Sequence, residues 1–177
     1  MSSVTTKQQE DNATNFDKIC EFQEAFEMKS FSNGITQEEI NDNPEIIKLR
    51  IDLIVEELNE LKQAINEKDI TEMRDAIGDI LYVVYGAAHT FGFDADSDFA
   101  TIHDSNMSKL CKTEEEAQQT VAKYEQDFKD GKTSYDSPYY YNNEKTSLWI
   151  VKNRSTGKVL KSIHYTPVKF DILTIIP

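Results

Sequence analysis

Two neighbouring segments in the middle of the chain repeat apolar residues at helical spacing. In the first, from Asn43-Pro44 to about residue 68, these residues recur every three or four positions: Ile47, Ile51, Ile54, Leu58, Leu61 and Ile65. In the second, over residues 70–90, one side is likewise apolar: Ile77, Leu81, Val84 and Ala88. Such stripes lie along one side of an α-helix and predict its buried face, and Asn-Pro is a typical helix start. We therefore predict two long helices joined by a short polar connection.

Shorter helices are predicted on either side of this pair. Apolar residues recur at three- and four-residue steps over residues 16–29. Asp94 is placed to cap a helix over about residues 95–110, and Thr113-x-x-Glu116 has the capping-box pattern of a further helix. Residues 1–14 are polar, and we expect them to form a disordered leader.

The character of the chain changes after residue 131. Residues 147–151 and 158–163 are rich in β-branched and aromatic side chains, and Ser155-Thr-Gly157 between them is a turn signal, so we expect a β-hairpin over 147–164. The predicted fold class is all-α, a helical bundle of four to five helices with a small C-terminal β-hairpin. The expected domains are a leader at 1–14, a helical domain at 15–130 and a hairpin extension at 131–177.

Composition excludes several classes of partner. The 177 residues carry a net charge of −13, which argues against a nucleic-acid backbone or an anionic membrane. The N-terminus has no apolar core, so we expect it to be neither a signal peptide nor an anchor. Cys20 and Cys111 have no motif spacing and are interpreted as reduced thiols. We expect a soluble, intracellular protein of the cytoplasm.

Six carboxylates follow the two long helices. At about 100° per residue, three lie within one arc of the first helix and three within one arc of the second: Glu56, Glu57, Glu60, Glu72, Asp75 and Asp79. A solvated acidic face is the ordinary interpretation of such a run. Asp79 argues against it, because it interrupts an apolar segment that is expected to be buried, where an unpaired carboxylate is costly.

A bound cation explains both clusters more economically. Carboxylates that converge between two helices repel one another, and hard oxygen ligands suit Mg²⁺ first, with Mn²⁺ as the alternative. A structural Ca²⁺ protein is a further possibility, but the chain has no Asp-x-Asp-x-Asp-Gly loop. We therefore predict a metal site that draws on Glu57, Glu60, Glu72, Asp75 and Asp79.

These motifs resemble the all-α nucleoside triphosphate pyrophosphohydrolases, which comprise MazG-like proteins, phosphoribosyl-ATP pyrophosphohydrolases and dimeric dUTPases. Their pattern of Glu-Glu-x-x-Glu followed by Glu-x-x-Asp is similar to Glu56-Glu57-Leu-Asn-Glu60 and Glu72-Met-Arg-Asp75. The stretch from Asp75 to Gly86 and the later His103-x-x-Asn106-Met-Ser-Lys109 resemble the phosphoribosyl-ATP branch. The likeness covers about residues 16–112.

The resemblance implies a homodimer or larger assembly, with metal held between the second and third helices. It also implies hydrolysis between the α and β phosphates of a nucleotide, giving a monophosphate and pyrophosphate. In that reaction Glu56 is the candidate for the general base, Lys109 supplies positive charge to the phosphates, and Asn106 supplies a hydrogen bond. An ordinary helix end is the alternative for Asn106 and Lys109.

One departure from the pattern leaves two questions open. If Asp79 aligns with the aspartate of Glu-x-x-Asp, Ala76 stands where the family has glutamate, and Glu72 and Asp75 are rival replacements. A catalytically inactive, oligomeric nucleotide-binding module is therefore the alternative function.

On the first helix, Gln23 and Phe26 are candidates for contact with a base, although core packing is the preferred interpretation of Phe26.

Overall fold

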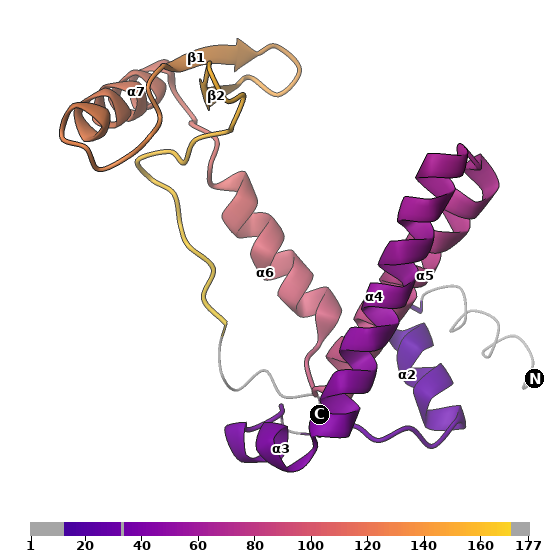
Figure 1. The fold of residues 1–177 in the computed structure, drawn as a ribbon. Coiled ribbons are helices and arrows are strands. Elements are labelled where there is room, and N and C mark those ends of the chain that lie inside the picture. Colours follow the sequence, from indigo (N-terminus) through magenta and orange to yellow (C-terminus); the bar gives the residue numbers. More distant parts are fainter. Residues whose placement is uncertain (1–12, 33, 171–177) are drawn as a thin grey trace, which may run out of the picture. The chain divides into compact units, whose positions relative to one another are not determined.

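The computed structural model describes residues 13–32 and 34–170, which form six α-helices and a two-stranded antiparallel sheet (Figure 1). This confirms the predicted, mostly helical fold with a small β-hairpin. The chain divides into two compact units after Asp98, and each is described by itself. Most of the predicted leader lies outside the described residues, and the predicted domain limits stay a prediction. No helix in the described ranges has the length and hydrophobicity needed to span a bilayer.

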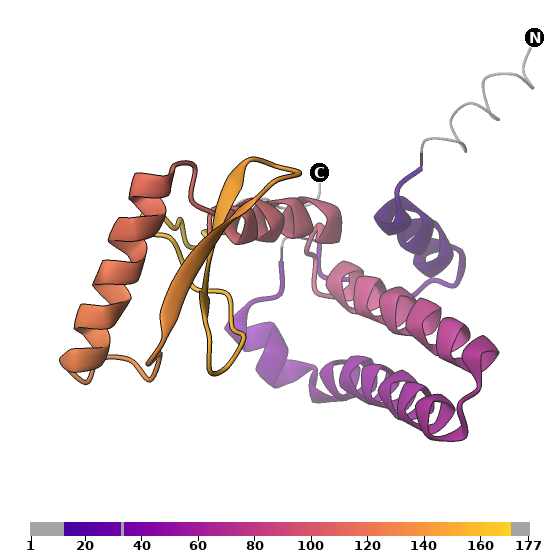
Figure 2. The same cartoon turned by 90° about the horizontal axis from the view of Figure 1, so that it is seen from above.

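The first unit is built on a helical hairpin. Helix α4 (Pro44–Glu67) and helix α5 (Ile70–Thr90) run side by side in opposite directions (Figures 1 and 2). Lys68 makes the turn with a left-handed φ of +60°, and the Asp69 carboxylate accepts hydrogen bonds from the first backbone N–H groups of α5. This two-residue connection holds the acidic segments of both helices in one hairpin.

Helix α2 (Asn15–Ala25) packs against α5, and the short helix α3 (Gln37–Asp42) precedes α4. Phe16 and Ile19 of α2 are buried, and the Phe16 ring lies 6.4 Å from the Tyr85 ring of α5. The loop that follows α2 crosses the end of α5 so closely that a Cβ at Gly92 would lie 1.8 Å from a backbone oxygen. Glycine is therefore required there.

The second unit combines helix α7 (Glu114–Lys129) with strands β1 (Pro138–Asn143) and β2 (Leu148–Asn153). The helix packs on the sheet over a small core that consists of Cys111, Ala117, Val151 and Leu160. Helix α6 (Ala95–Met107) leads into this unit, and the Asp94 carboxylate caps it as predicted.

The structure corrects the predicted hairpin. We expected residues 147–151 to pair with 158–163, but β2 pairs with β1, so that Tyr140 stands opposite Val151. The segment after β2 contributes only an isolated bridge between Val159 and Lys152. Both β1 and β2 pack against α7, and this shared packing accounts for their pairing.

The predicted apolar stripe of α4 is only partly buried among the described residues. Ile51, Leu58 and Ile65 are about half exposed. Ile77 and Leu81 on the apolar side of α5 are exposed to a similar degree. The two faces have the composition of a core, but the described part of the chain does not cover them.

Candidate functional site

Both acidic clusters lie in the first unit, where acidic residues predominate. Residues 99–170 carry eleven Lys and Arg against nine Asp and Glu, whereas the rest of the chain carries eight against twenty-three. Glu57 of α4 and Asp79 of α5 line one hollow of about 360 Å³, which is also lined by residues of α2. The hairpin therefore brings one carboxylate from each predicted cluster to the same hollow.

Glu57 is partly buried and is surrounded by other carboxylates. Its Oε2 atom is buried and has no hydrogen-bond partner among the described residues. Burial raises the pKa of Glu57, and the charges of Glu60, Asp79, Glu56 and Asp75 raise it further. An ionised oxygen without a donor, surrounded by like charges, is unfavourable unless a cation is bound to it.

The exposure of Asp79 and the position of Glu72 relative to Glu57 differ from what we expected. The Asp79 side chain is exposed, although it interrupts an apolar segment, so the argument from burial is wrong for Asp79 and applies instead to Glu57. Glu72 lies in the exposed first turn of α5 and is not among the charges that raise the pKa of Glu57, whereas Asp75 is. Ala76, at the position of the departure, is buried.

Carboxylate oxygens are the ligand type that a hard divalent cation prefers. The six carboxylates are, however, not gathered closely around one point. Within the described ranges, no group of three or more His, Cys, Asp or Glu side chains stands close enough together to hold a metal ion. None of the described Lys, Arg or His side chains forms an ion pair with any of the six. The donor set consists only of carboxylates, and the unpartnered Glu57 oxygen is the atom that a cation would satisfy.

The sequence prediction missed a buried polar network that includes two residues lining this hollow, Gln23 and Arg50. The side-chain oxygen of Gln23 lies within 3.3 Å of donors on Arg50 and Thr90 and 3.1 Å from Nδ1 of His89. The Gln23 amide donates to the Gly86 carbonyl oxygen at 2.9 Å. Arg50 stands seven residues before Glu57, which places both on one face of α4, and this spacing is the signal that sequence reasoning had available.

The two candidates for base contact, Gln23 and Phe26, differ in burial. Gln23 is buried and points into the network, whereas Phe26 is 64% exposed, so core packing of Phe26 is wrong for the described chain. Phe22 of the same helix lines the hollow instead, with its ring edge-on to Tyr82 at 5.5 Å. The aromatic wall near the carboxylates is therefore Phe22 and Tyr82.

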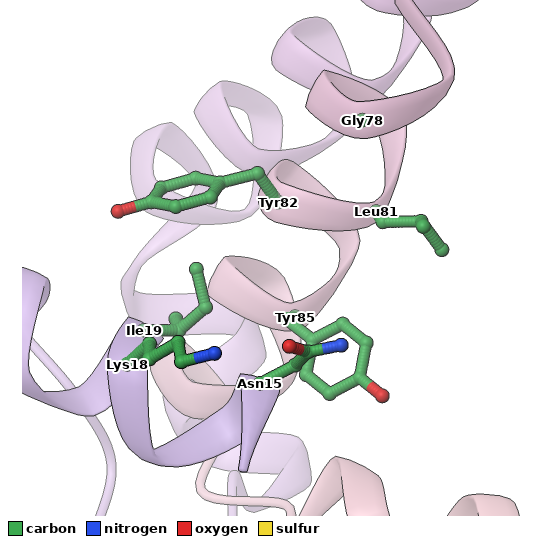
Figure 3. Close-up of a pocket in the computed structure, with 7 residues that line it drawn as sticks. All are labelled: Asn15, Lys18, Ile19, Gly78, Leu81, Tyr82 and Tyr85. Atoms are coloured by element: carbon green, nitrogen blue, oxygen red, sulfur yellow. The ribbon is translucent and has the colours of Figure 1, made fainter. Parts of the chain in front are cut away.

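Tyr82 also borders a smaller hollow of about 190 Å³ between α2 and α5. Figure 3 shows the residues of those two helices that line it: Asn15, Lys18, Ile19, Gly78, Leu81, Tyr82 and Tyr85. No carboxylate is among these residues, so this hollow is a less suitable site for metal-dependent chemistry.

Asn106 and Lys109 belong to the second unit. Asn106 lies in the last turn of α6, and the Lys109 ammonium donates to its side-chain oxygen at 2.6 Å. Ser162 donates its backbone N–H to the Lys109 carbonyl oxygen, and the Tyr165 hydroxyl is 3.2 Å from the Ser105 hydroxyl. The C-terminal segment therefore packs against the Asn-Met-Ser-Lys motif.

Comparison with known proteins agrees with the acidic motifs. Residues 19–106 match the model of a family described as phosphoribosyl-ATP pyrophosphohydrolase. The chain is also similar to the protein named "Uncharacterized protein L479" of Acanthamoeba polyphaga mimivirus, with 46% identity over 87 residues. That alignment covers 49% of the chain and 34% of the relative, so the chain spans about a third of the length of this relative.

Proposed function

Because residues 19–106 belong to the phosphoribosyl-ATP pyrophosphohydrolase family, as the motifs predicted, we propose that the protein is a metal-dependent nucleoside triphosphate pyrophosphohydrolase. It would cleave between the α and β phosphates and release a nucleoside monophosphate and pyrophosphate. The family match supports a nucleotide pyrophosphohydrolase-like function in general. The observation that carries the finer proposal is the unpartnered Glu57 oxygen in a hollow shared with Asp79.

The ligands that we propose for Mg²⁺, or Mn²⁺ in its place, are Glu57, Glu60 and Asp79, joined by Asp75 or Glu72. Asp75 is the stronger of the two because its charge acts on Glu57. When bound, the metal neutralises phosphate oxygens and lowers the pKa of water. The carboxylates of both helices would otherwise repel the triphosphate.

Glu56 is our candidate for the general base. It is exposed and adjoins Glu57 on α4, and a carboxylate outside the ligand set is free to accept the proton of the attacking water. For Lys109 and Asn106 we propose binding of substrate phosphate, since Lys109 forms no ion pair with a described carboxylate. Their existing hydrogen bond holds both polar groups together.

We further propose that the protein acts as a homodimer or larger homo-oligomer. The support comes from the exposed apolar faces of α4 and α5, which together carry side chains about 43–54% exposed: Ile51, Ile65, Ile77, Leu81 and Val84. Apolar side chains exposed in number along long helices are typical of an association site. Neither nucleic acid nor a membrane is proposed as a partner.

An inactive nucleotide-binding module is the second candidate. The observation in its favour is Ala76, which is buried at the position where the resemblance implies a ligand glutamate. The two functions differ in one respect, since the module binds nucleotide and leaves it intact.

The test is incubation of the full chain with a panel of NTPs and dNTPs plus Mg²⁺, with monophosphate and pyrophosphate as the measured products. We expect cleavage that Glu57→Ala and Asp79→Ala both abolish while the fold is retained. Full activity of either variant contradicts the proposed site. Binding of nucleotide without cleavage under Mg²⁺ or Mn²⁺ favours the module.

A further inference from the structure

Arg50 lines the same hollow, and its side chain carries a second buried polar atom that has no partner among the described residues. It is Nε of Arg50, a donor, and no described residue accepts a hydrogen bond from it. The Arg50 side chain is 8% exposed and remains charged, because burial lowers its pKa from a very high value. A buried charged donor without an acceptor is unfavourable, as is the buried Glu57 oxygen without a donor. The Glu57 oxygen requires a cation or a donor, whereas Arg50 Nε requires a hydrogen-bond acceptor.

The surroundings of Arg50 hold its guanidinium in place. Its Nη2 donates to the Gln23 side-chain oxygen at 3.3 Å and contacts the Met28 sulfur at 3.8 Å. Gln23 is itself fixed by the Gly86 carbonyl, and a Cβ at Gly86 would lie 2.8 Å from the Gln23 amide nitrogen. Gln23 therefore positions Arg50 and leaves Nε unused.

The rest of the hollow suits a planar ring. Its walls include Phe22, Tyr82, Leu53 and Val83, which are aromatic or aliphatic. Apolar walls with a few fixed polar groups are the usual composition of a site for a small organic ligand, and aromatic faces stack on nucleobases. Glu57 and Asp79, the proposed metal ligands, line the same hollow, so a ring bound here would lie beside the phosphate chemistry.

We propose that this hollow is the nucleobase site and that Arg50 selects bases with a carbonyl oxygen at C4 of a pyrimidine or at C6 of a purine, namely uracil, thymine or a 6-oxopurine. The inference rests on the proposed function. A carbonyl oxygen accepts a hydrogen bond from Nε, whereas the amino group of cytosine or adenine at the same position sets donor against donor. Arg50 is thus a specificity-determining residue.

Matched substrate pairs test this selection. UTP differs from CTP, and ITP from ATP, at one exocyclic group that is oxo in the first member and amino in the second. We expect the oxo member of a pair to have a kcat/KM about 10- to 100-fold higher, as for a site that hydrogen-bonds its substrate. The two pairs distinguish a pyrimidine from a purine as the preferred ring.

The variants that test the role of Arg50 are Arg50→Gln and Gly86→Ala, with Lys48→Gln as the control on the exposed side of α4. Arg50→Gln should reduce the oxo preference to about 3-fold or less. Gly86→Ala displaces Gln23 without removing the charge, so it should weaken the preference even if Arg50→Gln does not fold. Lys48→Gln should keep the full preference.

Two outcomes overturn the inference: equal use of both members of each pair by the wild type, or a preference that survives in both variants. If no nucleotide is hydrolysed, the proposed function fails, and calorimetric binding of UMP against CMP and of IMP against AMP still tests the base site. Tighter binding of UMP or IMP that is lost in Arg50→Gln then supports the site. Equal affinities within both pairs contradict it.

Discussion

Glu57→Gln should make the metal-free protein more stable and the enzyme inactive. The substitution keeps the size of the side chain and removes its charge. Glu57 has a raised pKa because its oxygen is buried and because Glu60, Asp79, Glu56 and Asp75 repel its charge. In the absence of metal, that charge opposes folding, whereas the reaction requires it.

The gain in stability can be estimated from the neighbours. Like charges one turn apart on a helix, such as Glu57 and Glu60, cost about 0.2–0.5 kcal/mol per pair. Asp79, Glu56 and Asp75 add to this repulsion, so we expect a total gain of about 1 kcal/mol. For a chain of 177 residues this corresponds to an increase in Tm of about 2–4 °C. Nucleotide hydrolysis should fall by about 100-fold or more, as when one electrostatic group of an active site is lost.

Thermal denaturation in EDTA measures the stability of the metal-free protein, and the same measurement in Mg²⁺ measures the stabilisation by bound metal. At a metal concentration 100 times Kd, the wild type should gain about 2.7 kcal/mol, and Glu57→Gln should lose most of this gain. Glu21→Gln, on the exposed side of α2, is the control and should change neither the Tm difference nor the activity. A lower Tm of Glu57→Gln in EDTA, or a metal response equal to that of the wild type, would refute the reasoning.

Three further predictions follow from other parts of the molecule. Because the folded-state pKa of Glu57 is raised, the stability of the metal-free protein should increase as pH falls through that pKa, while Mg²⁺ affinity measured by calorimetry declines over the same range. Leu81→Asp on the exposed face of α5 should reduce the mass measured by light scattering to that of a monomer, and an unchanged oligomer would contradict the proposed interface. Asn153→Ala removes a fully buried amide that bonds to Ser137 and Asp136, and urea denaturation should show a loss of about 1–3 kcal/mol.

Most of the helices could be predicted from the sequence because their signals are local, but α3 was not predicted, and α2 ends at Ala25, before the expected residue 29. Pro44 begins α4, and Thr113 accepts a hydrogen bond from the Glu116 backbone N–H at the start of α7, although the Glu116 carboxylate returns to Lys112 and not to Thr113. Strand pairing was predicted less well. A turn does follow β2, at residues 154–156, but the partner of β2 is fixed by packing on α7, which no local pattern records.

The site was predicted in part for a similar reason. Helical spacing placed Glu57 and Asp79 on facing helices correctly, because that spacing depends only on backbone geometry. Burial was assigned to the wrong carboxylate, because Asp79 is exposed although its neighbours in the sequence are apolar, whereas an oxygen of Glu57 is buried. The Gln23–Arg50 network joins residues 27 positions apart, and only the fold reveals it.

The most direct test of the central claim is the identity of the phosphorus products. Each NTP and dNTP of the panel is incubated with the full chain and Mg²⁺, and the reaction is followed by ³¹P NMR. Hydrolysis of the bond between the α and β phosphates predicts equal amounts of nucleoside monophosphate and pyrophosphate, with no nucleoside diphosphate at any time. Diphosphate with inorganic phosphate, or an unchanged triphosphate for every nucleotide, would contradict the account.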